Sequence, residues 1–279
     1  MKLFEQIMFF FVAVQIIGLF VGNIVVKDLT KNPYVNSLVV TNDINEPLNA
    51  GFFLAYVIFG AVAIMLLIKM NVLREMLFKI LEFFMIAGSS SIVFYALLRL
   101  AFGYDISTTA GSIFGLAFSA LKIYKPQLKN LAAIVSTAGV GVVFGISMGI
   151  MPMIIFLALL AIYDFVAVFL TKHMVEMANF VVKNDLAFTV TAREPGKTKD
   201  EKERRVDLGT GDLVAPVMME VSLLSINPLA SGVVFVGAII STGIFIWLVK
   251  DKKVVLPALP PIVIGMLLSF AVGKMFGIC

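Results

Sequence analysis

The sequence is poor in the residues from which most metal and redox sites are built. It has one Cys, Cys279, and one His, His173. A single Cys excludes disulfide frameworks and cysteine-ligated zinc or iron–sulfur clusters, and a single His excludes most histidine-ligated metal sites. Charge is also scarce, since 14% of the residues are charged against about 25% in an average soluble domain. We therefore expect no metal and no other cofactor, and an ordinary cytosolic enzyme is a poor fit.

Hydrophobic residues, by contrast, dominate the chain. They make up 60% of its 279 residues, and the mean hydropathy is +1.02. A helix that crosses the bilayer needs ~20 apolar residues, so we expect an all-α polytopic membrane protein with about nine transmembrane helices. The expected spans are 3–26, 51–69, 77–102, 107–121, 128–148, 151–171, 208–226, 230–249 and 256–276.

The distribution of positive charge supports this count. Of the 22 Lys and Arg residues, 18 lie at the N-terminus and in the even-numbered loops, and 4 lie in the odd-numbered loops and at the C-terminus. Cytoplasmic loops of membrane proteins carry an excess of Lys and Arg. The split therefore predicts a multi-pass protein of the cell membrane with its N-terminus in the cytoplasm and, after nine spans, its C-terminus outside.

The spans divide the chain into three regions. Residues 1–171 are expected to form an N-terminal membrane bundle of six spans, 172–207 a cytoplasmic loop, and 208–279 the last three spans. The latter half of the loop, 193–205, is dense in charges of both signs and is expected to be disordered. Before it, Leu186–Ala192 is rich in β-forming residues with partial alternation, so it is either a short strand or an exposed linker.

Three acids lie inside the expected spans, namely Asp164, Asp212 and Glu220. A carboxylate near the bilayer centre costs about 2.5–3.5 kcal/mol on insertion scales, so each acid is a functional candidate. At 1.5 Å per residue, Asp164 lies roughly 12 Å and Asp212 roughly 6–8 Å from the cytoplasmic face. Because their spans are adjacent and antiparallel, these two acids fall at similar depths. For Glu220 we favour a structural pairing or snorkelling role over a place in a polar cavity.

Two carboxylates that meet in a low-dielectric site cannot both ionise, so they share one proton. An aspartic protease needs this state. The ionised acid takes a proton from a water that attacks the scissile carbonyl, and the protonated acid donates to the carbonyl oxygen. Intramembrane acids beside broken helices are also typical of transporters and channels, which are the alternative. The odd number of spans and the lack of a visible inverted repeat argue against that alternative.

The backbone around these acids is expected to be irregular. Two glycines immediately precede Asp212, and glycine permits unwound backbone and close approach between helices. The segment Pro257–Pro261 contains three prolines, which cannot all sit in a regular helix because each lacks an N–H and clashes with the preceding turn. Irregular backbone at membrane depth is tolerated only where protein or a water-filled cavity covers it.

Nine residues form three short motifs on the sixth, seventh and ninth expected spans. They are Tyr163-Asp164, Gly209-Thr210-Gly211-Asp212 and Pro257-Ala258-Leu259. This ordered triplet resembles the presenilin and signal-peptide-peptidase family of intramembrane aspartyl proteases, most sharply from residue 151 onward. The resemblance implies that Asp164 and Asp212 are the catalytic pair, that the other seven residues border the active site, and that transmembrane helices are cleaved within the bilayer. Tyr163 is expected either to contact substrate or to pack.

The resemblance also bears on partners. The cytoplasmic N-terminus is similar to the presenilin orientation, and the loop 172–207 is much shorter than in animal presenilins. The chain is thus most similar to archaeal or bacterial homologues, which implies transmembrane proteins or peptides as substrates, no obligatory accessory subunit, room for a homo-oligomer, and no nucleic acid. Thr210 departs from the usual Leu, which affects substrate preference more than chemistry. We further expect Leu186–Ala192 to be loosely structured until an unwound substrate strand pairs beside it.

Overall fold

The computed structural model describes residues 2–69, 74–169, 177, 180–182, 184–194, 204–249 and 257–278. The predicted disorder at 193–205 is wrong at its two ends, because 193–194 and 204–205 lie in paired strands. The part between them, 195–203, lies outside the described residues, as do His173 and Cys279. Within the described residues the structure has nine long helices: α1 (Leu3–Asp28), α3 (Leu48–Lys69), α4 (Arg74–Leu98), α5 (Tyr104–Tyr124), α6 (Lys129–Ser147), α7 (Ile150–Phe169), α9 (Thr210–Leu224), α10 (Pro228–Val249) and α11 (Leu259–Met275). The short helices α2 (Pro33–Asn36) and η1 (Pro126–Leu128) and the strands β1 (Thr189–Glu194) and β2 (Arg204–Gly209) complete the described part.

Each long helix falls on one of the nine expected spans, so the predicted fold class is confirmed. Among the described residues, seven helices are long and apolar enough to cross a membrane, namely α1, α3, α4, α5, α6, α7 and α10. The seventh span was predicted too long, because β2 continues to Gly209 and only Thr210–Leu224 is helical. Asp212 therefore lies in the first turn of α9 instead of about five residues inside the span.

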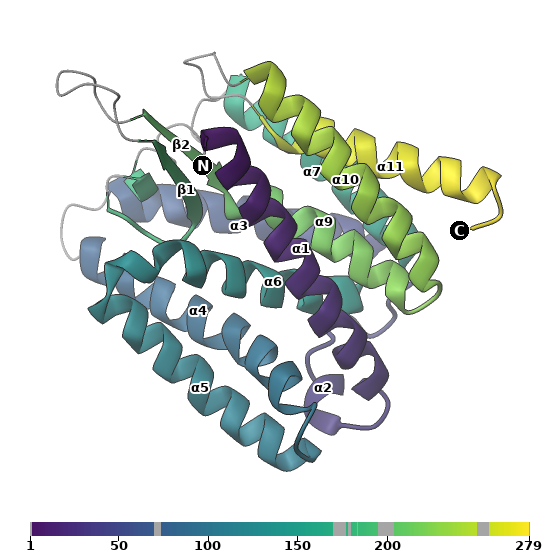
Figure 1. Ribbon diagram of the computed structural model, residues 1–279, viewed down its shortest axis with the longest axis horizontal. Helices are drawn as coiled ribbons and strands as arrows, with labels where there is room; N and C mark the ends of the chain where they lie inside the picture. Colours follow the sequence, from purple (N-terminus) through teal and green to yellow (C-terminus); the bar gives the residue numbers. More distant parts are fainter. Residues whose placement is uncertain are drawn as a thin grey trace.

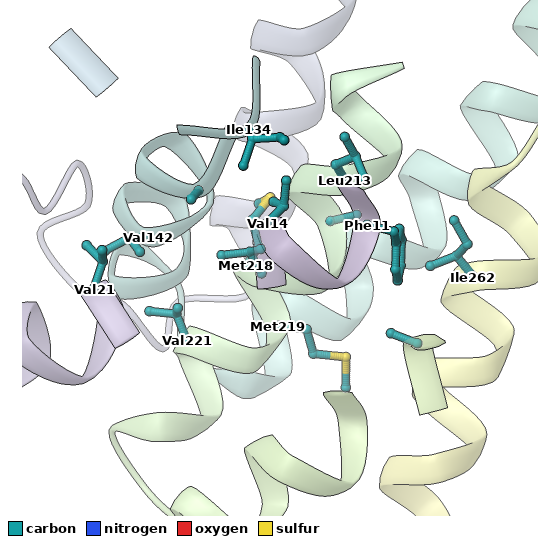
Figure 2. Close-up of a cluster of buried hydrophobic side chains, with 14 of the residues drawn as sticks. Phe11, Val14, Val21, Ile134, Val142, Leu213, Met218, Met219, Val221 and Ile262 are labelled. Carbon is teal, nitrogen blue, oxygen red and sulfur yellow. The ribbon is translucent and has the colours of Figure 1, made fainter. Parts of the chain in front are cut away.

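Helix α9 is the central element of the bundle (Figure 1). It packs against α1, α6, α7, α10 and α11, and every residue from Ala215 to Leu223 is buried. A helix that is buried on all faces must be apolar all round, and this one is, apart from Glu220 and Ser222. Figure 2 shows Met218, Met219 and Val221 of α9 among side chains of α1, α6 and α11.

Glycines bring two neighbouring helices close to α9. A Cβ added at Gly18 of α1 or at Gly141 of α6 would lie 2.5 or 2.6 Å from the side chain of Val217. One turn further along, Gly145 of α6 meets Val221 in the same way. Small residues that let backbones approach closely are the usual basis of helix packing in membranes. The three helices are thereby held together along the middle of α9, one to two turns beyond its first turn, where Asp212 lies.

The loop between α7 and α9 contributes a two-stranded antiparallel sheet beside the N-terminal end of α1 (Figure 1). Thr191 of β1 is opposite Asp207 of β2, and Arg193 is opposite Arg205. The strand interpretation of Leu186–Ala192 is thus confirmed from Thr189 onward. The expectation that this segment stays loose without a substrate is wrong, since β1 is already paired.

Side chains from two helices explain why β1 is ordered. The Asn130 side chain donates to the Thr191 carbonyl at 2.8 Å and accepts the Thr191 N–H at 2.9 Å. Gln6 does the same for Arg193, with distances of 2.9 and 3.1 Å. These two amides bind the edge of β1 that faces away from β2, as a neighbouring strand would. They also place the N-terminal end of α1 and the loop between α7 and α9 on one face of the bundle.

The long loop after α1 covers the junction between α6 and α7, which lies at the end of the bundle opposite the sheet. The Ser147 hydroxyl accepts the N–H of Val40 at 3.0 Å, and the Ser147 carbonyl accepts the Thr41 hydroxyl at 2.5 Å. The carbonyl of Ile44 accepts the N–H of Gly149 at 2.7 Å. This loop therefore closes the bundle on the face away from the sheet.

Candidate active site

The acids Asp164 and Asp212 line the same cavity, which has a volume of about 280 Å³. Asp164 is on α7 with 5% of its surface exposed, and Asp212 is partly exposed in the first turn of α9. The two carboxyl groups are close enough to interact electrostatically. The structure therefore brings together two acids that the sequence separates, as their matching depths predicted.

The Asp164 carboxylate is bound by the start of α11. The backbone of Leu259 forms a hydrogen bond with it, while Oδ2 has no hydrogen-bond partner among the described residues. Leu259 is the first residue of α11, and the first N–H groups of a helix have no partner within that helix. An N–H without a partner in its own helix thus binds the Asp164 carboxyl group.

Six of the nine predicted site residues line the cavity: Tyr163, Asp164, Thr210, Gly211, Asp212 and Leu259. Gly209 lies just outside it, and a Cβ added there would be 3.4 Å from Asp212 Oδ2. Pro257 and Ala258 are buried but are not part of the cavity wall. They instead lead into the first turn of α11.

The Gly-Thr-Gly segment joins β2 directly to α9. The backbone at Gly209 has φ −64° and ψ 141°, which any residue adopts, so the expected unwound backbone is not what the glycines provide. At Gly211 an added Cβ would meet nothing within 4 Å, so there is open space beside this residue. Thr210 anchors the junction, since its N–H and hydroxyl both donate to the Phe188 carbonyl, at 3.0 and 3.1 Å.

The prolines before and in α11 separate into two groups. Pro257 precedes the helix, whereas Pro260 and Pro261 lie in its first turn, where a missing N–H costs nothing. The prediction that the three prolines cannot all sit in one regular helix is therefore confirmed, since Pro257 lies outside α11.

Ala187 and Phe188, which precede β1, line the cavity, as expected for the segment Leu186–Ala192 beside a substrate strand. Three other wall residues, Ser89, Ser136 and Thr137, were not expected from the sequence. The Ser89 hydroxyl donates to the Met85 carbonyl of its own helix at 2.6 Å, which is not the geometry of an activated nucleophile. These residues come from segments far apart in the chain, and no short motif marks them.

Glu220 does not belong to the site. It is fully buried in α9, does not line the cavity, and neither carboxylate oxygen has a hydrogen-bond partner among the described residues. The predicted structural pairing or snorkelling is therefore wrong. Among the described residues no cluster of three or more His, Cys, Asp or Glu is placed to hold a metal ion.

Comparison with known proteins gives matches over nearly the whole chain. A family model described as signal-peptide peptidase, presenilin aspartyl protease matches residues 8–278. A solved structure of a presenilin family intramembrane aspartate protease in space group C222 is 19% identical, with a TM-score of 0.68 over 98% of this chain and 99% of that one. A second such structure, in space group P2, is 22% identical, with a TM-score of 0.63 over 94% and 96%. At these identities the likeness is one of fold. No curated protein matches the chain.

Proposed function

The chain belongs to the signal-peptide peptidase and presenilin family of aspartyl proteases, and from this premise we propose that Asp164 and Asp212 are its catalytic dyad. The protein is an intramembrane aspartic endopeptidase. Intramembrane acids alone had left a transporter or channel as the alternative function. Membership of a protease family favours the protease over that alternative. The observation that carries the assignment of the dyad is that both acids line one cavity and interact electrostatically.

The mechanism follows from the shared proton of the pair. Two interacting carboxyl groups in a low-dielectric site hold one proton between them. The ionised member removes a proton from a water molecule, which attacks the scissile carbonyl carbon, while the protonated member donates to the carbonyl oxygen. Collapse of the tetrahedral intermediate breaks the C–N bond and returns a proton to the leaving amine. The Leu259 N–H keeps the Asp164 carboxylate oriented through these steps.

A transmembrane substrate hides its peptide bonds inside a helix, so we propose that the site unwinds it into a strand. An extended segment in the membrane needs partners for its N–H and C=O groups, and strand addition to a sheet edge supplies them. One edge of β1 pairs with β2 and the other is bound by Asn130 and Gln6. The described sheet has two strands, so the outer edge of β2 is the edge on which a substrate strand is expected.

The proposed orientation places the sheet and the N-terminus in the cytoplasm. The site then takes its water from the cytoplasmic side, since Asp212 lies at the start of α9, next to β2. The Ser147 and Gly149 contacts of the outer loop close the other face. We also propose that the enzyme acts in the cell membrane on transmembrane proteins or peptides without an obligatory accessory subunit.

The direct test is incubation of the purified enzyme with a transmembrane peptide in lipid, with products identified by mass spectrometry. A peptidomimetic that carries a hydroxyl at the scissile position resembles the tetrahedral intermediate and should bind tightly. Hydrolysis that is blocked by this compound, and lost in Asp164→Asn and Asp212→Asn, is the expected result. Hydrolysis by the purified single variants would overturn the dyad.

A further inference from the structure

Glu82 of α4 and Lys122 of α5 form a buried ion pair that the mechanism above does not use. Glu82 is 2% exposed and Lys122 is 6% exposed, and Glu82 Oε1 contacts Lys122 Nζ. Removing two charges from solvent costs about as much as their attraction returns, so a buried ion pair is weak evidence of a role in stability. Its other contacts must therefore be considered.

The same carboxylate oxygen also binds the loop that enters β1. Glu82 Oε1 accepts the backbone N–H of Ala187 at 2.6 Å. Ala187 and the next residue, Phe188, both form part of the wall of the cavity that holds Asp164 and Asp212. A helix outside the α7–α9 pair is thus tied to the active-site wall by a charge-assisted hydrogen bond, the stronger kind.

From this wall the contacts continue to the catalytic helix. The Phe188 carbonyl accepts both the N–H and the hydroxyl of Thr210. Thr210 is the first residue of α9, and Asp212 lies two residues later in the same turn. A short path of hydrogen bonds and two peptide units therefore leads from Glu82 to the backbone that carries Asp212.

We propose that Glu82 is a positioning residue for proteolysis. Its carboxylate holds Ala187 and Phe188 in the cavity wall, so that Thr210 and the first turn of α9 present Asp212 to Asp164. Lys122 compensates the charge of the acceptor and holds it in place. This inference rests on the proposed dyad, since it concerns how Asp212 is held.

Two matched double variants separate the acceptor from the charge. In Glu82→Gln/Lys122→Met the buried charges are gone, but an amide oxygen still accepts the Ala187 N–H. In Glu82→Met/Lys122→Met the charges and the acceptor are both gone. Because neither variant leaves an unpaired buried charge, both are expected to keep the fold.

The expected result is a difference in turnover between the two variants. The Gln-containing variant should cleave a transmembrane peptide at close to the wild-type rate. The Glu82→Met/Lys122→Met variant should lose roughly tenfold in kcat with KM little changed, because one lost hydrogen bond affects the placement of a reacting group. Hydrogen exchange of the Ala187 amide should rise in the Glu82→Met/Lys122→Met variant alone. Equal kcat in the two folded variants would overturn the proposal.

A third variant covers the case in which Glu82→Met/Lys122→Met does not fold. Exchanging the pair, Glu82→Lys/Lys122→Glu, keeps a buried ion pair but places an ammonium donor opposite the Ala187 N–H. Slow cleavage with an unchanged unfolding temperature is expected, and wild-type cleavage would contradict the positioning role. The same assay includes Asp212→Asn. If that variant still cleaves, the dyad is wrong; if it does not cleave and the Glu82 variants behave alike, only the positioning role falls.

Discussion

The backbone N–H of Leu259 donates to the carboxylate of Asp164. This contact joins the first residue of α11 to the C-terminal part of α7, and it depends on where α11 begins. Pro257 lies just before the helix and has no N–H to donate. The helix begins at Leu259. The first N–H groups of a helix have no partner inside it, so the Leu259 N–H is free to bind the acid.

Replacing Pro257 by Ala should lower the cleavage rate without unfolding the bundle. Alanine permits α11 to begin earlier, and an earlier start gives the Leu259 N–H a carbonyl partner inside the helix. Pro261→Ala is the matched control, because Pro261 already lies within the first turn of α11. The measurement is cleavage of a transmembrane peptide beside the circular dichroism of each variant. Equal loss of rate in both variants would show that the position of Pro257 is not special.

Neutralising either member of the dyad should stop hydrolysis. We expect Asp164→Asn and Asp212→Asn each to lower the rate by roughly 10²–10⁴-fold or to background, since neither acid can perform both proton transfers. The fold should survive, because removing one buried carboxylate relieves a desolvation cost. Glu220→Gln is the matched control, an intramembrane acid of the same helix as Asp212 that does not line the cavity. Comparable loss of activity in all three variants would point to general damage instead of a dyad.

Glu220 itself should be a source of instability. It is fully buried, and its carboxylate oxygens have no partner among the described residues. Burying a polar group without a hydrogen bond costs about 1–3 kcal/mol, so Glu220→Met should raise the free energy of unfolding by a similar amount. The measurement is thermal unfolding in one detergent, with peptide cleavage as the check on function. A lower unfolding temperature would mean that the carboxyl group has a stabilising partner.

The helices and the proximity of Asp164 and Asp212 could be predicted because local features of the sequence determine them. Long apolar runs fixed the spans, and the depths of Asp164 and Asp212 within adjacent antiparallel helices placed them side by side. The position of Leu259 beside the acids was suggested by the motif order, but the hydrogen bond itself depends on how α11 packs. The residues of the candidate site can be recognised in the sequence. The contacts that orient them can be seen only in the folded structure.

A strand at β1 was one of the two predicted alternatives, but its order in the free protein and the Glu82 contacts could not be predicted, because they depend on partners far along the chain. The order of β1 comes from Asn130 and Gln6, and the amide of Gln6 is 187 residues from Arg193. Glu82 and Ala187 are 105 residues apart. Neither pair leaves a periodic pattern, since each is a single side chain bound to backbone. The seventh span was overestimated for a related reason, as the apolar end of β2 continues into α9 without a break.

The cavity should be open to water from the cytoplasmic side, because hydrolysis consumes water. Gly211 is exposed, lines the cavity, and has open space where a side chain would be added. Gly211→Cys, in a Cys279→Ser background, should react with a water-soluble thiol reagent and be protected by the hydroxyl-containing peptidomimetic. Val221→Cys is the control, because Val221 is fully buried and should stay unreactive. Equal, slow labelling of the two cysteines in the free enzyme would contradict an open cavity.

Substrate binding should add a strand to β2 and leave β1 unchanged. Thr191 and Arg193 turn their backbone groups toward Asn130 and Gln6, so their register partners in β2, Asp207 and Arg205, turn theirs to the outer edge of the sheet. A peptidomimetic long enough to extend from the dyad should therefore slow hydrogen exchange across 204–209, while 189–194 stays as protected as in the free enzyme. Asp212→Asn should show the same protection, because it removes chemistry and not the sheet. New protection confined to 189–194 would place the substrate strand at β1, and unchanged exchange in both segments would remove strand addition and leave the dyad alone.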